Sequence, residues 1–85
     1  GNSDAQNLLG TLYHNGKGIQ QDYSQAKIWY EKSAAQNNAY AQYNIGLLYY
    51  YGFGVLKNVT QAKYWFEKSA AQGYDSAKKI LSTMK

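Results

Sequence analysis

The chain repeats its own sequence after 36 residues, and this repeat limits the possible folds more than any other feature. Residues 25–36 read QAKIWYEKSAAQ and residues 61–72 read QAKYWFEKSAAQ, so ten of the twelve positions are identical. The two substitutions, Ile28 to Tyr64 and Tyr30 to Phe66, keep a bulky side chain. A period of roughly 20–50 residues is typical of arrays in which small units stack on one another. We therefore interpret the repeated text as architecture.

The repeat extends over nearly the whole chain. Further positions that recur 36 residues later are Ala5, Gln6, Gly10, Leu12, Tyr13, Gly16 and Gly18. A third copy begins at Ala77 and carries Leu81 and Met84 at its apolar positions. We predict a single repeat domain over residues 1–85, with repeat one at about 3–38, repeat two at about 39–74 and a capping helix at about 75–85.

Each unit is predicted to contain two helices. Apolar residues in the first half of unit one follow the spacing of one helical face, namely Ala5, Leu8, Leu9, Leu12 and Tyr13. The second half shows the same spacing at Ala26, Trp29, Tyr30, Ser33 and Ala34. Gly10 and Gly46 are expected to let the paired helices approach closely opposite Ala26 and Ala62. Trp29 and Trp65 are expected to fill the space between units.

Local signals indicate where these helices begin and end. The segment Asn15-Gly16-Lys17-Gly18 interrupts the first apolar pattern, and glycine readily adopts the positive φ found at helix C-termini. Asp22 and Asn58 are predicted N-caps of the second helices. Asn37 and Gly73 stand where those helices should stop.

The pattern A-Q-x3-G-x-L-Y-x2-G-x-G-[IV], followed by Q-A-K-x-W-[YF]-E-K-S-A-A-Q, resembles the Sel-one-like repeat family, relatives of tetratricopeptide repeat proteins. The resemblance covers essentially the whole chain. It implies an all-α fold, a right-handed α-α superhelical solenoid of two helix-turn-helix repeats plus a C-terminal capping helix. It also implies a scaffold that binds other proteins.

The chain departs from the family pattern in two respects. The family usually has proline after the Gly-x-Gly turn, where this chain has Ile19-Gln20-Gln21 and Val55-Leu56-Lys57, so a looser turn is expected. The cysteine pairs of the family's disulfide-rich branch are also missing, because the chain has no cysteine. Nothing particular to that branch is therefore expected here.

In tetratricopeptide-like arrays the first helix of each unit lines the concave surface, and this geometry selects candidate contact residues. The predicted protein-binding groove consists of Asn7, Thr11, His14, Asn15, Tyr40, Tyr43, Leu47, Tyr50, Tyr51 and Lys79. From the first helix of unit one to the capping helix, the predicted groove residues change from polar to aromatic and then to basic. The tyrosines and Leu47 would supply apolar contact, His14 and Asn15 hydrogen bonds, and Lys79 a charge for an acidic partner.

Two interpretations of the tyrosines stay open. Tyr40, Tyr43 and Tyr50 share one helical face with Leu47. They can form a ligand-binding patch, because tyrosine combines a large contact area with a polar tip and an exposed apolar patch usually marks an interface. They can equally support the packing of neighbouring helices.

Three functions follow from these features. The first is a non-catalytic adaptor or regulator that binds a peptide or protein segment in the groove. The second is a structural segment of a longer array that self-associates through exposed terminal helices; the chain begins without Met, and we expect an excised or processed fragment. The third is weak single-stranded nucleic-acid binding through lysine and stacked tyrosine.

Charge argues against nucleic acid as the main partner. The net charge is +4 and the nine basic residues are all lysine, which lacks the bidentate base contacts of arginine. Only Lys78, Lys79 and Lys85 cluster. The usage rich in Lys, Asn and Tyr and free of Arg favours an AT-rich genome. The resemblance to a family that is common in bacteria implies a bacterial source.

Little in the sequence supports catalysis, metal binding or a cofactor. His14 is the only histidine and has no carboxylate at helical spacing to orient it. Glu31 and Glu67 each follow a lysine by four residues, which is typical of a solvated charged face. The Gly-x-Gly segments follow a helix rather than a strand, so they indicate turns and not phosphate loops.

No membrane or export signal is expected either. No apolar run reaches the roughly 20 residues that a membrane span needs. The start, GNSDAQNLLG, lacks the basic and apolar segments of a signal peptide.

Overall fold

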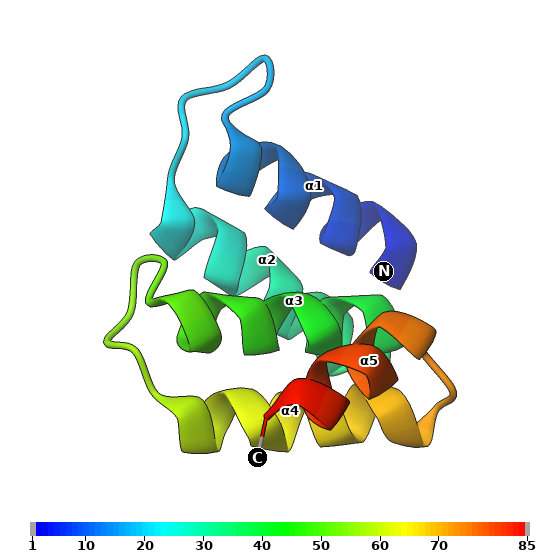
Figure 1. Cartoon of the computed structure of the whole chain (residues 1–85). Coiled ribbons are helices and arrows are strands. Elements are labelled where there is room, and N and C mark those ends of the chain that lie inside the picture. Colours follow the sequence, from blue (N-terminus) through cyan, green and yellow to red (C-terminus); the bar gives the residue numbers. More distant parts are fainter. Residues whose placement is uncertain (1, 85) are drawn as a thin grey trace.

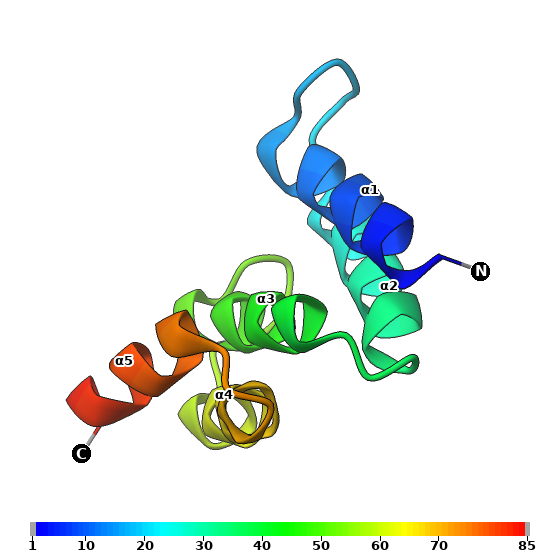
Figure 2. The same ribbon diagram turned by 90° about the vertical axis from the view of Figure 1, so that its right-hand side faces the viewer.

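The computed structural model describes residues 2–84, and within them the chain forms five helices. They are α1 (Ser3–Asn15), α2 (Tyr23–Ala34), α3 (Ala39–Tyr51), α4 (Val59–Ala71) and α5 (Asp75–Thr83). Each helix reverses the direction of the one before (Figure 1). The first helices α1, α3 and α5 follow one side of the molecule, and α2 and α4 follow the other (Figure 2). The predicted all-α solenoid is confirmed, and residues 2–84 contain no strand.

The second helices begin at the predicted capping residues. Asp22 and Asn58 each accept a hydrogen bond from the backbone N–H three residues later, at 3.1 and 3.0 Å. Their own N–H groups donate to the carbonyls of Tyr13 and Tyr49, both at 2.9 Å. Each cap therefore starts one helix and ties it to the last turn of the helix before, in a turn without proline.

The predicted helix ends are also confirmed. Gly16 and Gly52 end α1 and α3 in the left-handed region, with φ of 70° and 75°. Their N–H groups donate to the carbonyl four residues earlier, both at 2.8 Å. Asn37 and Gly73 follow α2 and α4 with φ of 67° and 88°. Asparagine and glycine are the residues that adopt this backbone conformation most readily.

Within each unit, the two helices approach through a glycine and an aromatic ring. A Cβ atom at Gly10 would lie 2.6 Å from the ring of Tyr30, and one at Gly46 would lie 2.5 Å from the ring of Phe66. Both rings are buried. The predicted close approach is present, but an aromatic ring occupies the space left by the missing Cβ, rather than the alanine alone.

Hydrogen bonds recur between the same helices in both units. Each is donated by a serine or a glutamine of the repeated segment. The serine hydroxyls donate to backbone carbonyls, Ser33 to Ser3 at 2.6 Å and Ser69 to Ala39 at 2.7 Å. The glutamine amides pair side chain to side chain, Gln36 with Gln6 at 2.6 Å and Gln72 with Gln42 at 3.0 Å.

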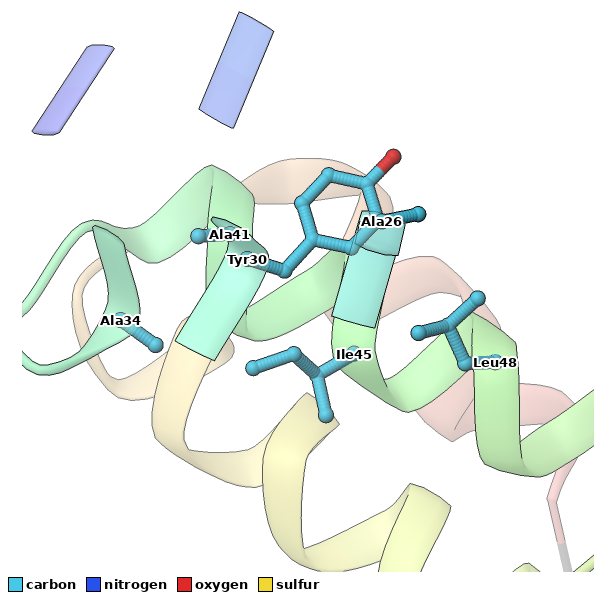
Figure 3. Close-up of a cluster of buried hydrophobic side chains, with 6 residues drawn as sticks. All are labelled: Ala26, Tyr30, Ala34, Ala41, Ile45 and Leu48. Atoms are coloured by element: carbon cyan, nitrogen blue, oxygen red, sulfur yellow. The ribbon is translucent and has the colours of Figure 1, made fainter. Parts of the chain in front are cut away.

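The hydrophobic core lies between the units, where α2 packs on α3. Figure 3 shows its six buried side chains, which are Ala26, Tyr30, Ala34, Ala41, Ile45 and Leu48. Trp65 packs against this cluster from α4, as predicted. Trp29 is half-buried and lies under the ammonium group of Lys32, at 4.5 Å from its ring centroid. These contacts hold α3 between α2 and α4 and so determine which face of α3 is exposed to solvent.

The apolar face of α1 is largely uncovered. Ala41 and Ile45 on α3 are fully buried, but the equivalent Ala5 is exposed and Leu9 is half-buried. Leu8 is 59% exposed. The difference arises because α3 packs on α2, whereas no second helix within residues 2–84 precedes α1. Among the helices described, none has the length and apolar character needed to cross a membrane.

Candidate protein-binding surface

The tyrosines predicted to bind a ligand differ in exposure along α3. Tyr40 and Tyr51, at the two ends of the helix, are 49% and 57% exposed. Tyr43, Leu47 and Tyr50, between them, are half-buried. Because α3 is a single regular helix whose opposite face forms the core, these five side chains are brought together on one surface.

These tyrosines belong to a longer run of contacting rings, here called the aromatic chain. Successive ring centroids lie 5.0–6.2 Å apart, within the range of favourable aromatic pairs. In order of contact its members are Tyr40, Tyr74, Tyr43, Phe66, Tyr50, Tyr51 and Phe53, and Phe53 contacts both Tyr23 and His14. The aromatic chain extends from the start of α5 to the end of α1.

Four members of the aromatic chain were not among the predicted groove residues. They are Tyr23, Phe53, Phe66 and Tyr74. The repeat gave no signal for Phe53, because Lys17 holds the same position in unit one. A single aromatic residue between two turn glycines is an unusual choice for an exposed turn, and this was the signal that could have identified it.

The tyrosines of α3 differ in what their rings contact and in how far they are exposed. The ring of Tyr43 contacts Phe66 and Tyr74, with centroids at 5.6 and 5.3 Å, so it supports the packing of α3 on α4. Burial raises the pKa of both Tyr43 and Tyr74. Tyr40 and Tyr51 keep about half of their surface exposed and are available for contact.

The polar groove residues of α1 take part in internal hydrogen bonds. Asn44 donates from Nδ2 to Oδ1 of the buried Asn7 at 3.0 Å. The hydroxyl of Thr11 donates to the carbonyl of Asn7 at 3.1 Å and lies 3.2 Å from the hydroxyl of Tyr30. These contacts link α1 to α2 and α3. The structure therefore engages both residues in the scaffold, whereas Asn15 is exposed at the end of α1.

His14 lies between two aromatic rings. Its ring centroid is 5.2 Å from Tyr23 and 5.1 Å from Phe53. The Nδ1 atom is buried and has no hydrogen-bond partner among residues 2–84. Burial lowers the pKa of His14 from its ordinary value of 6.5, so the ring is neutral at pH 7. A neutral imidazole can pack against aromatic rings and donate one hydrogen bond.

The lysines of α5 and α2 differ in their surroundings. Lys79 is exposed on α5, which packs on α4. On α2 the ammonium group of Lys27 forms an ion pair with Glu31 at 3.0 Å, as expected for a charged outer face. The hydrogen bond to Glu31 raises the pKa of Lys27.

Comparison with known proteins supports the same reading of the repeat. A model of the Sel1 repeat matches residues 3–38 and 39–74. A search of curated protein sequences found no match. A crystal structure of a Sel1 repeat protein from Oxalobacter formigenes matches 98% of this chain with 40% sequence identity and a TM-score of 0.95.

Two further solved structures are similar. A protective antigen of uropathogenic Escherichia coli strains matches 88% of the chain, with 43% identity and a TM-score of 0.85. Helicobacter pylori cysteine-rich protein B matches 92%, with 33% identity and a TM-score of 0.84. This chain spans 34%, 16% and 59% of the three proteins in the order given. All three come from bacteria. With matching repeats over most of its length, the chain belongs to the Sel1 repeat family.

Proposed function

We propose that this chain is a non-catalytic adaptor or regulator that binds a peptide or protein segment on the exposed side of α3. Sel1 repeat proteins are generally protein-interaction scaffolds rather than enzymes. The proposed contacts are Tyr40, Tyr51 and the exposed parts of Leu47 and Tyr50. Asn15 and Lys79 would add polar and charged contacts at the two ends of the surface.

The observation that carries this proposal is the exposure of Tyr40 and Tyr51 within the aromatic chain. Each ring is held on one side by a neighbour, Tyr40 by Tyr74 at 5.5 Å and Tyr51 by Tyr50 at 5.0 Å. A ring that is already ordered loses little conformational freedom when a ligand packs on its other side. Aromatic residues of this kind dominate the binding energy of many protein interfaces.

The small accessible surface of the molecule limits the area that a binding interface can cover. A typical stable interface covers about 800 Å² on each partner, which is about a sixth of the 5072 Å² of accessible surface here. A ligand of that footprint would cover much of the α3 side. We therefore expect most of the binding energy to come from a few tyrosines rather than from total area.

Affinity capture from a lysate of the source cells tests the proposal. We expect the unmodified chain to retain a partner that a Tyr40→Ser, Tyr51→Ser double variant loses. The matched control is Tyr64→Ser, because Tyr64 is 51% exposed on α4, on the other side of the molecule. Equal capture by all three chains would contradict the assignment of α3, provided that circular dichroism shows each to be folded.

A second candidate function is self-association through α1. It is supported by the 59% exposure of Leu8 and by the uncovered apolar face around it. Sedimentation equilibrium over a range of concentrations should then show reversible oligomers that Leu8→Glu reduces. Leu56→Glu is the control, because Leu56 is 91% exposed in the turn before α4. A single monomeric species at every concentration would rule this function out.

A further inference from the structure

A pocket of ≈ 680 Å³ lies where α3 ends and α4 begins. Its walls include Tyr50 and Tyr51 of α3, Lys57 of the turn, Val59 and Lys63 of α4, and Met84. They combine apolar and aromatic surface with two ammonium groups. Only Tyr50 and Tyr51 also belong to the surface proposed to bind a protein, so most of the pocket is a separate feature.

At the equivalent position of unit one, a side chain of the protein itself fills the space. Shifted by one repeat of 36 residues, Tyr50 and Val59 correspond to His14 and Tyr23. The ring of Phe53 lies against both of these residues. It meets His14 edge-on, with centroids 5.1 Å apart and an interplanar angle of 81°, and stacks on Tyr23 at 5.2 Å and 23°. The chain itself thus shows that a phenyl ring fits this place in the repeat.

The ring of Phe53 reaches its place because its turn approaches very closely. Gly54 has φ of 72°, and a Cβ atom at this residue would lie 2.5 Å from the Cβ of Tyr23. Only glycine allows this conformation and this distance together. The occupant in unit one is therefore an aromatic side chain on a tight turn whose next residue is glycine.

The charge around the two places differs. In unit one the positions of Lys57 and Lys63 are held by Gln21 and Lys27. Lys27 is neutralised by its ion pair with Glu31, at 3.0 Å. In the part of the chain that the structure describes, neither Lys57 nor Lys63 forms an ion pair. The pocket of unit two therefore offers two ammonium groups beside the position that corresponds to that of the Phe53 ring in unit one, in a chain whose net charge is +4.

We propose that this pocket binds an aromatic side chain on a tight turn of a protein partner, with a carboxylate of the partner next to Lys57 or Lys63. The ring takes the place that Phe53 takes in unit one and packs against Tyr50, Val59 and Met84. The negative charge of the partner's carboxylate complements the positive charge of these lysines. This inference rests on the proposed function in that the ligand is a polypeptide, and it specifies the chemistry that the ligand presents.

A short peptide tests the pocket directly. The probe is acetyl-Asp-Gly-Phe-Gly-Asp-amide, titrated to millimolar concentration into the labelled chain while NMR signals are recorded. We expect saturable shifts of the Val59 and Met84 methyl groups. Replacing the probe's Phe by Ala should weaken binding about tenfold. Replacing both Asp by Asn should weaken it less and remove its dependence on salt.

Two variants of the chain sharpen the test. Val59→Tyr provides the stacking ring that Tyr23 provides in unit one, so it should tighten binding of the probe several-fold. Lys63→Gln should weaken binding of the acidic probe and leave binding of the Asn probe unchanged. Both positions are exposed, so neither variant is expected to unfold the chain. Failure of Val59→Tyr to tighten binding would contradict stacking as the mode of recognition.

The remaining outcomes separate this inference from the proposed function. Retention of a partner through Tyr40, with no shift of Val59 or Met84 on adding the probe, would overturn this inference alone. Binding of the probe, with partner capture unaffected by Tyr40→Ser and Tyr51→Ser, would support it and overturn the assignment of α3. Shifts of Val59 and Met84 that grow with protein concentration alone would show that a second copy fills the pocket, and would overturn the inference.

Discussion

Substituting Gly46 by alanine tests the packing on which the position of α3 depends. Taken alone, an alanine in place of a helical glycine stabilises a helix by about 1 kcal/mol. Here the new Cβ atom would lie 2.5, 2.6 and 3.1 Å from three atoms of the Phe66 ring. Phe66 is fully buried, so its ring has no free space into which it can move. The two effects therefore have opposite signs.

The packing effect is the larger of the two. Overfilling a packed core costs about 1–3 kcal/mol, and contacts this short with a buried ring favour the upper end of that range. Subtracting the gain in helix propensity leaves a net destabilisation of about 2 kcal/mol. For a chain of this size, each kcal/mol lowers the melting temperature by about 4–8 °C.

Urea unfolding of the Gly46→Ala chain, monitored by circular dichroism, measures this loss. Ser82→Ala is the matched control, because Ser82 holds the same repeat position on α5 and is exposed. We expect the control to change stability little. A Gly46→Ala, Phe66→Leu double variant should lose less than the sum of the two single variants, because the smaller side chain leaves room for the new methyl group. A Gly46→Ala chain as stable as the original would refute this account of the packing.

Three further predictions concern single side chains. Asn58→Ala removes the N-cap of α4 and should cost about 1 kcal/mol in urea unfolding, whereas Asn58→Asp should retain most of the stability. Ser69→Ala removes the buried hydroxyl that donates to the carbonyl of Ala39 at 2.7 Å; that carbonyl also accepts a hydrogen bond within α3, so losing this one bond should cost about 0.5–1.5 kcal/mol in urea unfolding. The folded-state pKa of His14 lies below its ordinary value of 6.5, so the unfolded chain takes up the proton first. Stability should then be full above pH 6.5 and fall as the pH decreases below it; His14→Gln should flatten this dependence, and a chain more stable at pH 5.5 than at 7.5 would contradict it.

The helices were predictable because their signals are local and occur twice. Asp22 and Asn58 cap their helices through a hydrogen bond to a backbone group three residues away. Such a contact depends on the immediate sequence and on little else. The apolar spacing of Ala5, Leu9 and Leu12 likewise identified one face of a first helix, and the residues 36 positions later, Ala41, Ile45 and Leu48, form the core face of α3. Repetition of each signal in a second unit separated it from chance.

The candidate surface was less predictable because it depends on contacts distant in sequence. The spacing of Leu8 shows which face of α1 is apolar but not whether another helix covers it. The polar atoms of Asn7 and Thr11 on α1 contact Asn44 and Tyr30, which are distant in sequence, so the local pattern could not show these contacts. The direction of Phe53 follows from the close packing of its turn on Tyr23, which no repeat position indicated.

The repeated text therefore specifies the scaffold, and the residues that differ between units are the candidates for function. At matching positions unit one has Asp4, Asn7 and Asn15, and unit two has Tyr40, Tyr43 and Tyr51. Unit two thus places its aromatic residues on a helix framed on both sides by packed neighbours. A rigid support of this kind favours recognition by a small number of ordered side chains.

The most direct measurement of the central claim is an NMR map of the labelled chain titrated with the partner captured by affinity. If the exposed side of α3 binds this partner, the largest shifts will fall on Tyr40, Leu47, Tyr50 and Tyr51, and signals of the control residue Tyr64 on α4 will change little. Shifts centred on α4 around Tyr64, with α3 unaffected, would show that the partner binds the opposite side and would contradict the claim.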